Sequence, residues 1–178
     1  MRAARRGRLF MLCGIPGSGK TTIALAIGAR LDKCVHIETD VVRGMIAKPQ
    51  YASTESRFVY RGAFAMAAEA LKNRYDVVLV ATFPKEEVRR EAIDRLGNLC
   101  EAWLMVWAWC DPELAFRRNS QRNPRVRRED FMRLWRTYEP PRDALVIDSR
   151  STSPEEAARR ILATLGGDGE SALAGRPS

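Results

Sequence analysis

The fold of this chain is decided by one glycine-rich stretch, which reads Gly14-Ile15-Pro16-Gly17-Ser18-Gly19-Lys20-Thr21-Thr22. The stretch follows a short apolar run at residues 9–13, typical of a buried strand, and precedes apolar residues at helical spacing between Ile23 and Leu31. A turn of glycines between a strand and a helix lets backbone N–H groups point inward at the helix N-terminus, where they bind phosphate. The pattern therefore predicts a loop that cradles the phosphates of a nucleoside triphosphate.

Two side chains of this stretch have expected roles beyond that of the backbone. We expect Lys20 to reach the β- and γ-phosphates and the Thr21 hydroxyl to be a ligand of Mg²⁺. A glycine turn with an unrelated lysine is the alternative, but the strand before the loop and the helix after it favour the phosphate loop. The predicted ligands are ATP or GTP together with Mg²⁺, and the sequence does not distinguish the two nucleotides.

Length and composition limit the number of domains and the class of protein. A chain of 178 residues suits one α/β domain and is too short for two of ordinary size. Apolar residues make up 46% and charged residues 29%, as in a soluble globular protein, and no apolar run is long enough to cross a membrane. We expect a cytoplasmic protein, because the basic N-terminus lacks the apolar stretch of a secretory signal.

The formal net charge of +8 makes a phosphate-rich partner, including RNA or DNA, a reasonable expectation. An excess of arginine is also common in enzymes that handle nucleotides, so charge alone favours nucleic acid only modestly. The four cysteines show no paired metal spacing and are expected to be reduced core residues.

Apolar runs and helical patterns alternate along the chain, which predicts a parallel sheet covered on both faces. The expected strands are residues 9–13, 34–38, 76–81, 102–109 and 144–147. The expected helices are residues 21–31, 41–47, 53–74, a helix opened by Pro84, and residues 111–122, 129–135 and 154–165. The predicted fold is an α/β P-loop NTPase, a three-layer sandwich with a five-stranded parallel sheet. Residues 1–166 would form this domain, and the Gly-, Ser- and Ala-rich tail at 167–178 is expected to be disordered.

An acidic residue follows the second expected strand, in the segment Thr39-Asp40-Val41-Val42-Arg43. Ligands of an open parallel sheet bind beyond the carboxyl ends of its strands, so we expect Asp40 to lie near the γ-phosphate. A carboxylate there would accept the proton of an attacking hydroxyl, as a kinase requires. Arg43 would share a helix face with Asp40 and hold an acceptor phosphate. The simpler alternative is that Asp40 only caps the following helix.

Six arginines and no acidic residue occupy residues 117–128. Because these charges repel one another unless an anion is nearby, we expect a mobile basic lid at about residues 118–130 that covers the triphosphate. Arg118 and Arg122 are four residues apart and are predicted to point in the same direction. The alternative is a solvated basic helix end, since charge runs usually are solvated faces.

Together these motifs resemble a class of small P-loop kinases. The class includes the kinase domain of bacterial polynucleotide kinase-phosphatases, archaeal seryl-tRNA kinase and the zeta-toxin group. The shared features are the phosphate loop, Thr-Asp-x-x-Arg-Gly at 39–44, a long helix, Val-Val-x-x-Ala-Thr at 77–82, Arg-Asn-x-x-Arg at 118–122, Tyr-Glu-Pro-Pro at 138–141 and Val-Ile-Asp at 146–148. The likeness covers residues 9–149, nearly the whole chain.

The resemblance implies roles for individual side chains. It implies that Asp40 is the general base, that Arg43 contacts the acceptor, and that Arg118 and Arg122 bind the donor phosphates. Arg89, early in the helix after the third strand, matches a substrate-side arginine of the polynucleotide kinases.

The chain departs from the class at the end of the third expected strand. The class commonly has Asp-Ala-Thr-Asn there, whereas this chain has Val80-Ala81-Thr82-Phe83. Without the acid, an outer-shell partner of Mg²⁺ is lost, and the metal would rest on Thr21, with Asp40 or Glu38 acting through water. Phe83 replaces a polar residue and is expected to contact a base or an apolar acceptor.

These observations predict a kinase that transfers the γ-phosphoryl group of a Mg²⁺–NTP to a hydroxyl. The expected acceptor is the 5′-hydroxyl end of RNA or DNA, because of the resemblance, of Arg43 and Arg89, and of the net charge. Two alternatives stay open: a kinase of a nucleoside, sugar, amino acid or antibiotic, and a nucleotide-dependent regulatory protein. A GTPase switch is disfavoured, because the chain contains no Asn-Lys-x-Asp motif.

Overall fold

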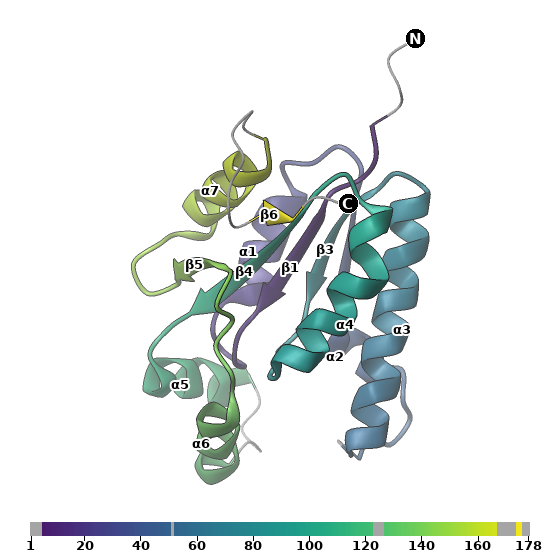
Figure 1. Ribbon diagram of the computed structural model, residues 1–178. Helices are drawn as coiled ribbons and strands as arrows, with labels where there is room; N and C mark the ends of the chain where they lie inside the picture. The colour runs from purple at the N-terminus through teal and green to yellow at the C-terminus, as the bar shows by residue number, and fades with distance from the viewer. Residues whose placement is uncertain (1–4, 51, 123–126, 167–173, 176–178) are drawn as a thin grey trace.

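The computed structural model describes residues 5–50, 52–122, 127–166 and 174–175 and contains a parallel sheet between two helical layers (Figure 1). Five parallel strands lie in the spatial order β2-β3-β1-β4-β5. Their bounds are β1 Leu9–Cys13, β2 Cys34–Glu38, β3 Asp76–Val80, β4 Trp103–Trp109 and β5 Leu145–Asp148. The order reverses at β1, where β3 and β4 lie on either side, and ligands of such sheets bind beyond the carboxyl ends at this point.

Helices cover both faces of the sheet. Helices α3 and α4 pack on one face and α1 and α7 on the other, while α5 and α6 lie beyond the carboxyl ends of β1 and β4 (Figure 1). The helices are α1 Lys20–Gly28, α2 Thr39–Gly44, α3 Ser53–Lys72, α4 Glu86–Leu96, α5 Pro112–Arg122, α6 Arg128–Thr137 and α7 Pro154–Gly166, with a 3₁₀ turn at Gly97–Leu99. Among the described residues, no helix combines the length and apolarity needed to cross a bilayer.

The alternating side chains of β1 join the two helical layers. Leu9 and Met11 face the core under α3 and α4, whereas Phe10 and Leu12 face the core under α1 and α7. All of these side chains are fully buried. A strand that is apolar on both faces must lie between two layers, which is why β1 occupies the centre of the sheet.

The predicted α/β P-loop NTPase fold with five parallel strands is confirmed, and the strand ends agree to within one or two residues. One difference is that α2 begins at Thr39 instead of Val41, and the Thr39 hydroxyl donates to the Val80 carbonyl oxygen in β3 (3.4 Å). A second is the short strand β6, Ala174–Gly175, which pairs antiparallel with β4 inside the expected disordered tail. The rest of that tail and lid residues 123–126 lie outside the described residues.

A buried aspartate at the amino end of β3 fixes the entry of the chain into β1. Asp76 accepts hydrogen bonds from the backbone N–H of Arg8 (2.7 Å), from the Arg8 guanidinium (2.8 Å) and from Arg5 (2.7 Å). Burial raises the pKa of Asp76, but the hydrogen bonds and charges of Arg8 and Arg5 outweigh it and hold the pKa below the usual 3.8. The ionised carboxylate therefore stabilises the fold.

We expect Asp76→Ala to lower the free energy of unfolding by about 2–3 kcal/mol, because the Arg8 N–H and guanidinium lose their acceptor. The contribution of Asp76 is complete above the pKa of the unfolded chain, near 3.8, and is lost as the pH falls through the lower folded value. Urea unfolding at pH 7 and at pH 3 measures both effects. Glu101→Gln is the control, since the pair of Glu101 with Arg5 is half-exposed; an equal loss in the two variants would contradict the prediction.

Candidate nucleotide-binding site

The loop between β1 and α1 is bounded so tightly that only glycine fits at key positions. Gly14, Gly17 and Gly19 have φ values of 139°, 81° and 92°, in the range that side chains disfavour. A Cβ atom at Gly17 would lie 2.1 Å from the carbonyl oxygen of Ala115 in α5. The loop therefore lies directly against α5, at the N-terminus of α1, where a phosphate loop binds its ligand.

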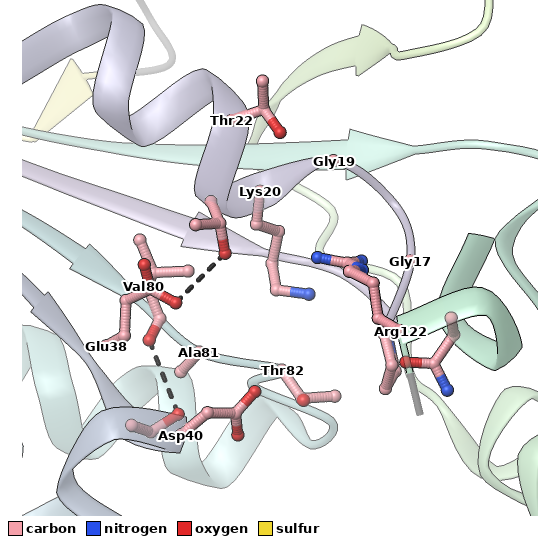
Figure 2. A pocket seen from close by; sticks show the side chains of 14 residues that line it. Gly17, Gly19, Lys20, Thr22, Glu38, Asp40, Val80, Ala81, Thr82 and Arg122 are labelled. Atoms are coloured by element: carbon pink, nitrogen blue, oxygen red, sulfur yellow. Dashed lines mark hydrogen bonds between the residues drawn. The ribbon is translucent and has the colours of Figure 1, made fainter. Parts of the chain in front are cut away.

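A cavity of about 250 Å³ opens beside this loop (Figure 2). It is lined by Pro16, Gly17, Gly19, Lys20, Thr21, Thr22, Glu38, Thr39, Asp40, Val80, Ala81, Thr82, Asn119 and Arg122. Most of the predicted loop residues are among them. Gly14 and Ser18 are not: both are buried beneath the loop, where the Gly14 N–H donates to the Thr82 carbonyl oxygen (3.3 Å) and the Ser18 N–H to that of Ile15 (3.2 Å).

Lys20 points into the cavity and is held by the loop itself (Figure 2). Its ammonium group donates to the Ile15 carbonyl oxygen at 2.9 Å. Burial lowers the pKa of Lys20 to about 8, although the charges of Asp40 and Glu38 oppose the shift. Because Lys20 is largely removed from water and its charge is only partly compensated, an anion bound in the cavity would stabilise its protonated form.

The carboxylates of Glu38 and Asp40 face the loop from β2 and α2. Glu38 accepts a hydrogen bond from the Thr21 hydroxyl at 3.0 Å, and Asp40 lies across the cavity from Lys20 (Figure 2). Asp40 does not cap α2: the N-cap residue is Glu38, and no side chain makes the cap hydrogen bond. Asp40 is instead exposed in the first turn of the helix, where it is open to a ligand.

The two predicted lid arginines lie in different surroundings. Arg122 lines the cavity together with Asn119, one helical turn earlier on α5. Arg118, by contrast, donates to the Ser149 hydroxyl (3.0 Å) and to the Ser149 carbonyl oxygen (3.3 Å), after β5. The expectation that both arginines point the same way is therefore wrong for this structure, because Arg118 links α5 to the end of β5.

Two side chains expected to contact the acceptor lie in the protein interior. Phe83 is fully buried against Tyr60 and Phe64, with ring centroids 5.7 and 6.4 Å apart. Arg89 is only 5% exposed and donates to the carbonyl oxygens of Phe83 and Glu139, both at 2.8 Å. In this structure neither lines the cavity, which corrects the expectation for both residues.

Arg43 also has partners within the protein. Its guanidinium forms an ion pair with Glu55 and donates to the Ser56 hydroxyl at 3.2 Å, which ties α2 to α3. Three further residues line the cavity: Glu38, one of the two acids expected to hold the metal through water, and Asn119 and Thr82, for which the sequence predicted no role. Their positions contained a signal: Asn119 precedes Arg122 by three residues on one helix, and Thr82 follows the carboxyl end of β3.

Fold and cavity define the class of protein: an α/β domain of the P-loop NTPase fold. The profile of the AAA domain family matches residues 9–141, and the chain belongs to that family. The adenylate kinase of Sulfurovum sp. (strain NBC37-1) is 31% identical over an alignment that covers 50% of this chain and 51% of the relative. The chain thus spans about half the length of the curated relatives that it matches.

Solved structures of kinases share the fold at low sequence identity. The Mycobacterium tuberculosis APS kinase CysC, solved with AMPPNP and APS, has a TM-score of 0.75 at 18% identity, covering 90% of this chain and 98% of its own. A chain of the Pnkp1/Rnl/Hen1 complex has a TM-score of 0.58 at 21% identity, covering 66% of this chain and 40% of its own.

Within the described residues, no group of three His, Cys, Asp or Glu side chains could by itself hold a metal.

We expect the binding of ADP at about pH 8.5 to take up protons, because bound phosphate raises the pKa of Lys20 above its free value of about 8. Calorimetry in two buffers of different ionisation enthalpy measures this uptake. Lys20→Arg should remove it at saturating ADP, because a guanidinium stays protonated. Lys33→Met, at the far end of β2, should retain it, and uptake that persists in Lys20→Arg would contradict the assignment.

We expect Arg89→Ala to lower the free energy of unfolding by about 2–3 kcal/mol, because the buried carbonyl oxygen of Phe83 and the partly buried one of Glu139 lose their donor. Urea unfolding measures the loss. Arg90→Ala is the matched control: Arg90 is exposed and pairs with Glu86 one turn away, a contact that contributes at most about 0.5 kcal/mol. If the two variants had the same free energy of unfolding, the hydrogen bonds of Arg89 would not stabilise the fold.

Proposed function

We propose that this chain is a kinase that transfers the γ-phosphoryl group of ATP or GTP to a hydroxyl acceptor. The observation that carries the proposal is the single cavity that brings together Lys20, Thr21 and Asp40. An ATPase or a binding protein also needs the first two residues, but an accessible carboxylate opposite the phosphate loop is what a hydroxyl acceptor requires.

The reaction follows from these positions. The acceptor oxygen attacks the γ-phosphorus, a new P–O bond forms, and the bond from phosphorus to the β,γ-bridging oxygen breaks to release the nucleoside diphosphate. Asp40 takes the proton of the acceptor hydroxyl. Lys20, Arg122 and the loop N–H groups stabilise the charge that develops on the phosphoryl oxygens. Mg²⁺, for which the Thr21 hydroxyl is the fitting ligand, supplies further positive charge when it is bound.

Our first candidate for the acceptor is the 5′-hydroxyl end of RNA or DNA. Its support is the net charge of +8, the resemblance to polynucleotide kinases and the shared fold with Pnkp1. A small hydroxylated molecule is the second candidate, and one observation favours it: Arg43 and Arg89, the expected contacts of a nucleic-acid end, bind protein groups instead.

The four cysteines are free, which supports a reducing, cytoplasmic location.

We expect Asp40→Asn to abolish phosphoryl transfer while leaving the affinity for ADP unchanged, because the amide cannot take a proton but keeps the side-chain shape. General base catalysis contributes a factor of about 10²–10⁴, which sets the size of the loss. The test incubates the protein with γ-labelled ATP or GTP, Mg²⁺ and a 5′-hydroxyl oligonucleotide at low salt.

Asp94→Asn, an exposed acid on α4 outside this cavity, is the control and should transfer normally. Label on the oligonucleotide that is lost in Asp40→Asn supports the first acceptor, and its yield should fall steeply with salt. Nucleotide consumed without label on the oligonucleotide points to a small acceptor. Transfer that survives Asp40→Asn would overturn the role of Asp40.

A further inference from the structure

The end of β3 offers no acid to the cavity. In the segment Val80-Ala81-Thr82-Phe83, the first three residues line the cavity, and none is charged. Mg²⁺ prefers oxygen ligands, usually keeps several waters, and is commonly bound through one or two carboxylates together with substrate phosphates. If a nucleotide-bound metal is to be held beside Thr21, the carboxylate must come from another element.

Glu38 lies at the same level of the sheet, one strand away. It is the last residue of β2, and the parallel register places its Cα directly opposite that of Val80 in β3. Both residues line the cavity, and Figure 2 shows them side by side. A carboxylate at Glu38 can therefore reach the space that an acid at position 80 would have reached, with a side chain one methylene longer than aspartate.

The contact between Glu38 and Thr21 sets up the hydroxyl for a metal. The Thr21 hydroxyl donates its one proton to Glu38 (3.0 Å), so both of its lone pairs stay available to a cation. The other carboxylate oxygen of Glu38 lies 3.1 Å from Nε2 of His36, which shares that face of β2 two residues earlier. The hydrogen bond from Thr21 thus holds one oxygen of Glu38 beside the expected metal position, as supporting groups of metal sites do, while the other oxygen lies next to the His36 ring.

We propose that Glu38 replaces the missing acid of β3 and, with the Thr21 hydroxyl, forms the protein's share of a Mg²⁺ site for the bound nucleotide. This inference rests on the nucleotide-dependent function proposed above. The two carboxylates then divide their tasks: Glu38, at the end of β2 beside Thr21, holds the waters of the metal, and Asp40, in the first turn of α2, is left for the acceptor.

The test measures binding of Mn²⁺, used as a probe for Mg²⁺, to the complex with ADP by electron paramagnetic resonance. We expect Glu38→Gln to weaken Mn²⁺ binding by about 10- to 100-fold, the usual cost of removing a supporting carboxylate. ADP should still bind to this variant without metal, because the phosphate loop is intact. Glu69→Gln, an exposed acid on α3, is the control and should bind Mn²⁺ as the unmodified chain does.

A relocated acid gives the sharpest outcome. Val80→Asp introduced into the Glu38→Gln variant puts the carboxylate back on β3, opposite its present position, and should restore Mn²⁺ binding. If thermal unfolding shows that Glu38→Gln does not fold, Glu38→Asp is used in its place. Its side chain is one methylene shorter, so the carboxylate lies farther from the metal, and Mn²⁺ binding should still weaken.

The outcomes separate this inference from the proposed function. If ADP binds but Glu38→Gln binds Mn²⁺ as tightly as the unmodified chain does, Glu38 is not the metal's carboxylate, and the proposed kinase activity is unaffected. If the unmodified chain does not bind ADP, both proposals fail. Loss of Mn²⁺ binding in Asp40→Asn but not in Glu38→Gln would transfer the metal role to Asp40 and overturn the division of tasks.

Discussion

The site depends on one steric constraint: the turn from β1 into α1 passes so close to other backbone that no side chain fits. A Cβ atom at Gly14 would lie 2.4 Å from the carbonyl oxygen of Ala108 in β4, and one at Gly17 would meet α5. The loop is also tied to the end of β3 through the N–H of Gly14. Three elements therefore fix the loop before any ligand arrives, and dipoles that are already oriented need no reorganisation when phosphate binds.

The protein's own charges around the cavity are poorly balanced. Arg122 repels Lys20, and the charges of Asp40 and Glu38 only partly compensate for the burial of Lys20. The hydrogen-bond partner of the Lys20 ammonium group is itself neutral, the carbonyl oxygen of Ile15. A polyphosphate would supply the charge that the cavity lacks, and the energy gained is larger here than in water because the surroundings are less polar.

The sequence was sufficient for features that depend on position along the chain, and insufficient for those that depend on side-chain direction. Apolar runs located all five parallel strands, and the glycine pattern located the loop, because both follow from backbone requirements. Asp40 was placed correctly at the cavity because every parallel strand ends at the same edge. Arg118 and Arg89 were misjudged, since a guanidinium on a long side chain can turn toward carbonyl oxygens that only the folded chain brings near.

Phe83 shows why a single substitution can mislead a sequence-based prediction. Its φ of 49° is unusual for a bulky residue, and it is held at both ends: the Phe83 N–H donates to the Tyr60 hydroxyl (3.0 Å), and its carbonyl oxygen accepts from Arg89. This backbone conformation directs the ring into the core, away from the cavity. The aromatic ring thus stabilises the turn after β3 instead of contacting a ligand, and Thr82 becomes the last residue of that turn to face the cavity. Thr82 and Asp40 accordingly line the cavity at the ends of β3 and β2, and for the proposed kinase they are the groups that a hydroxyl acceptor would meet there.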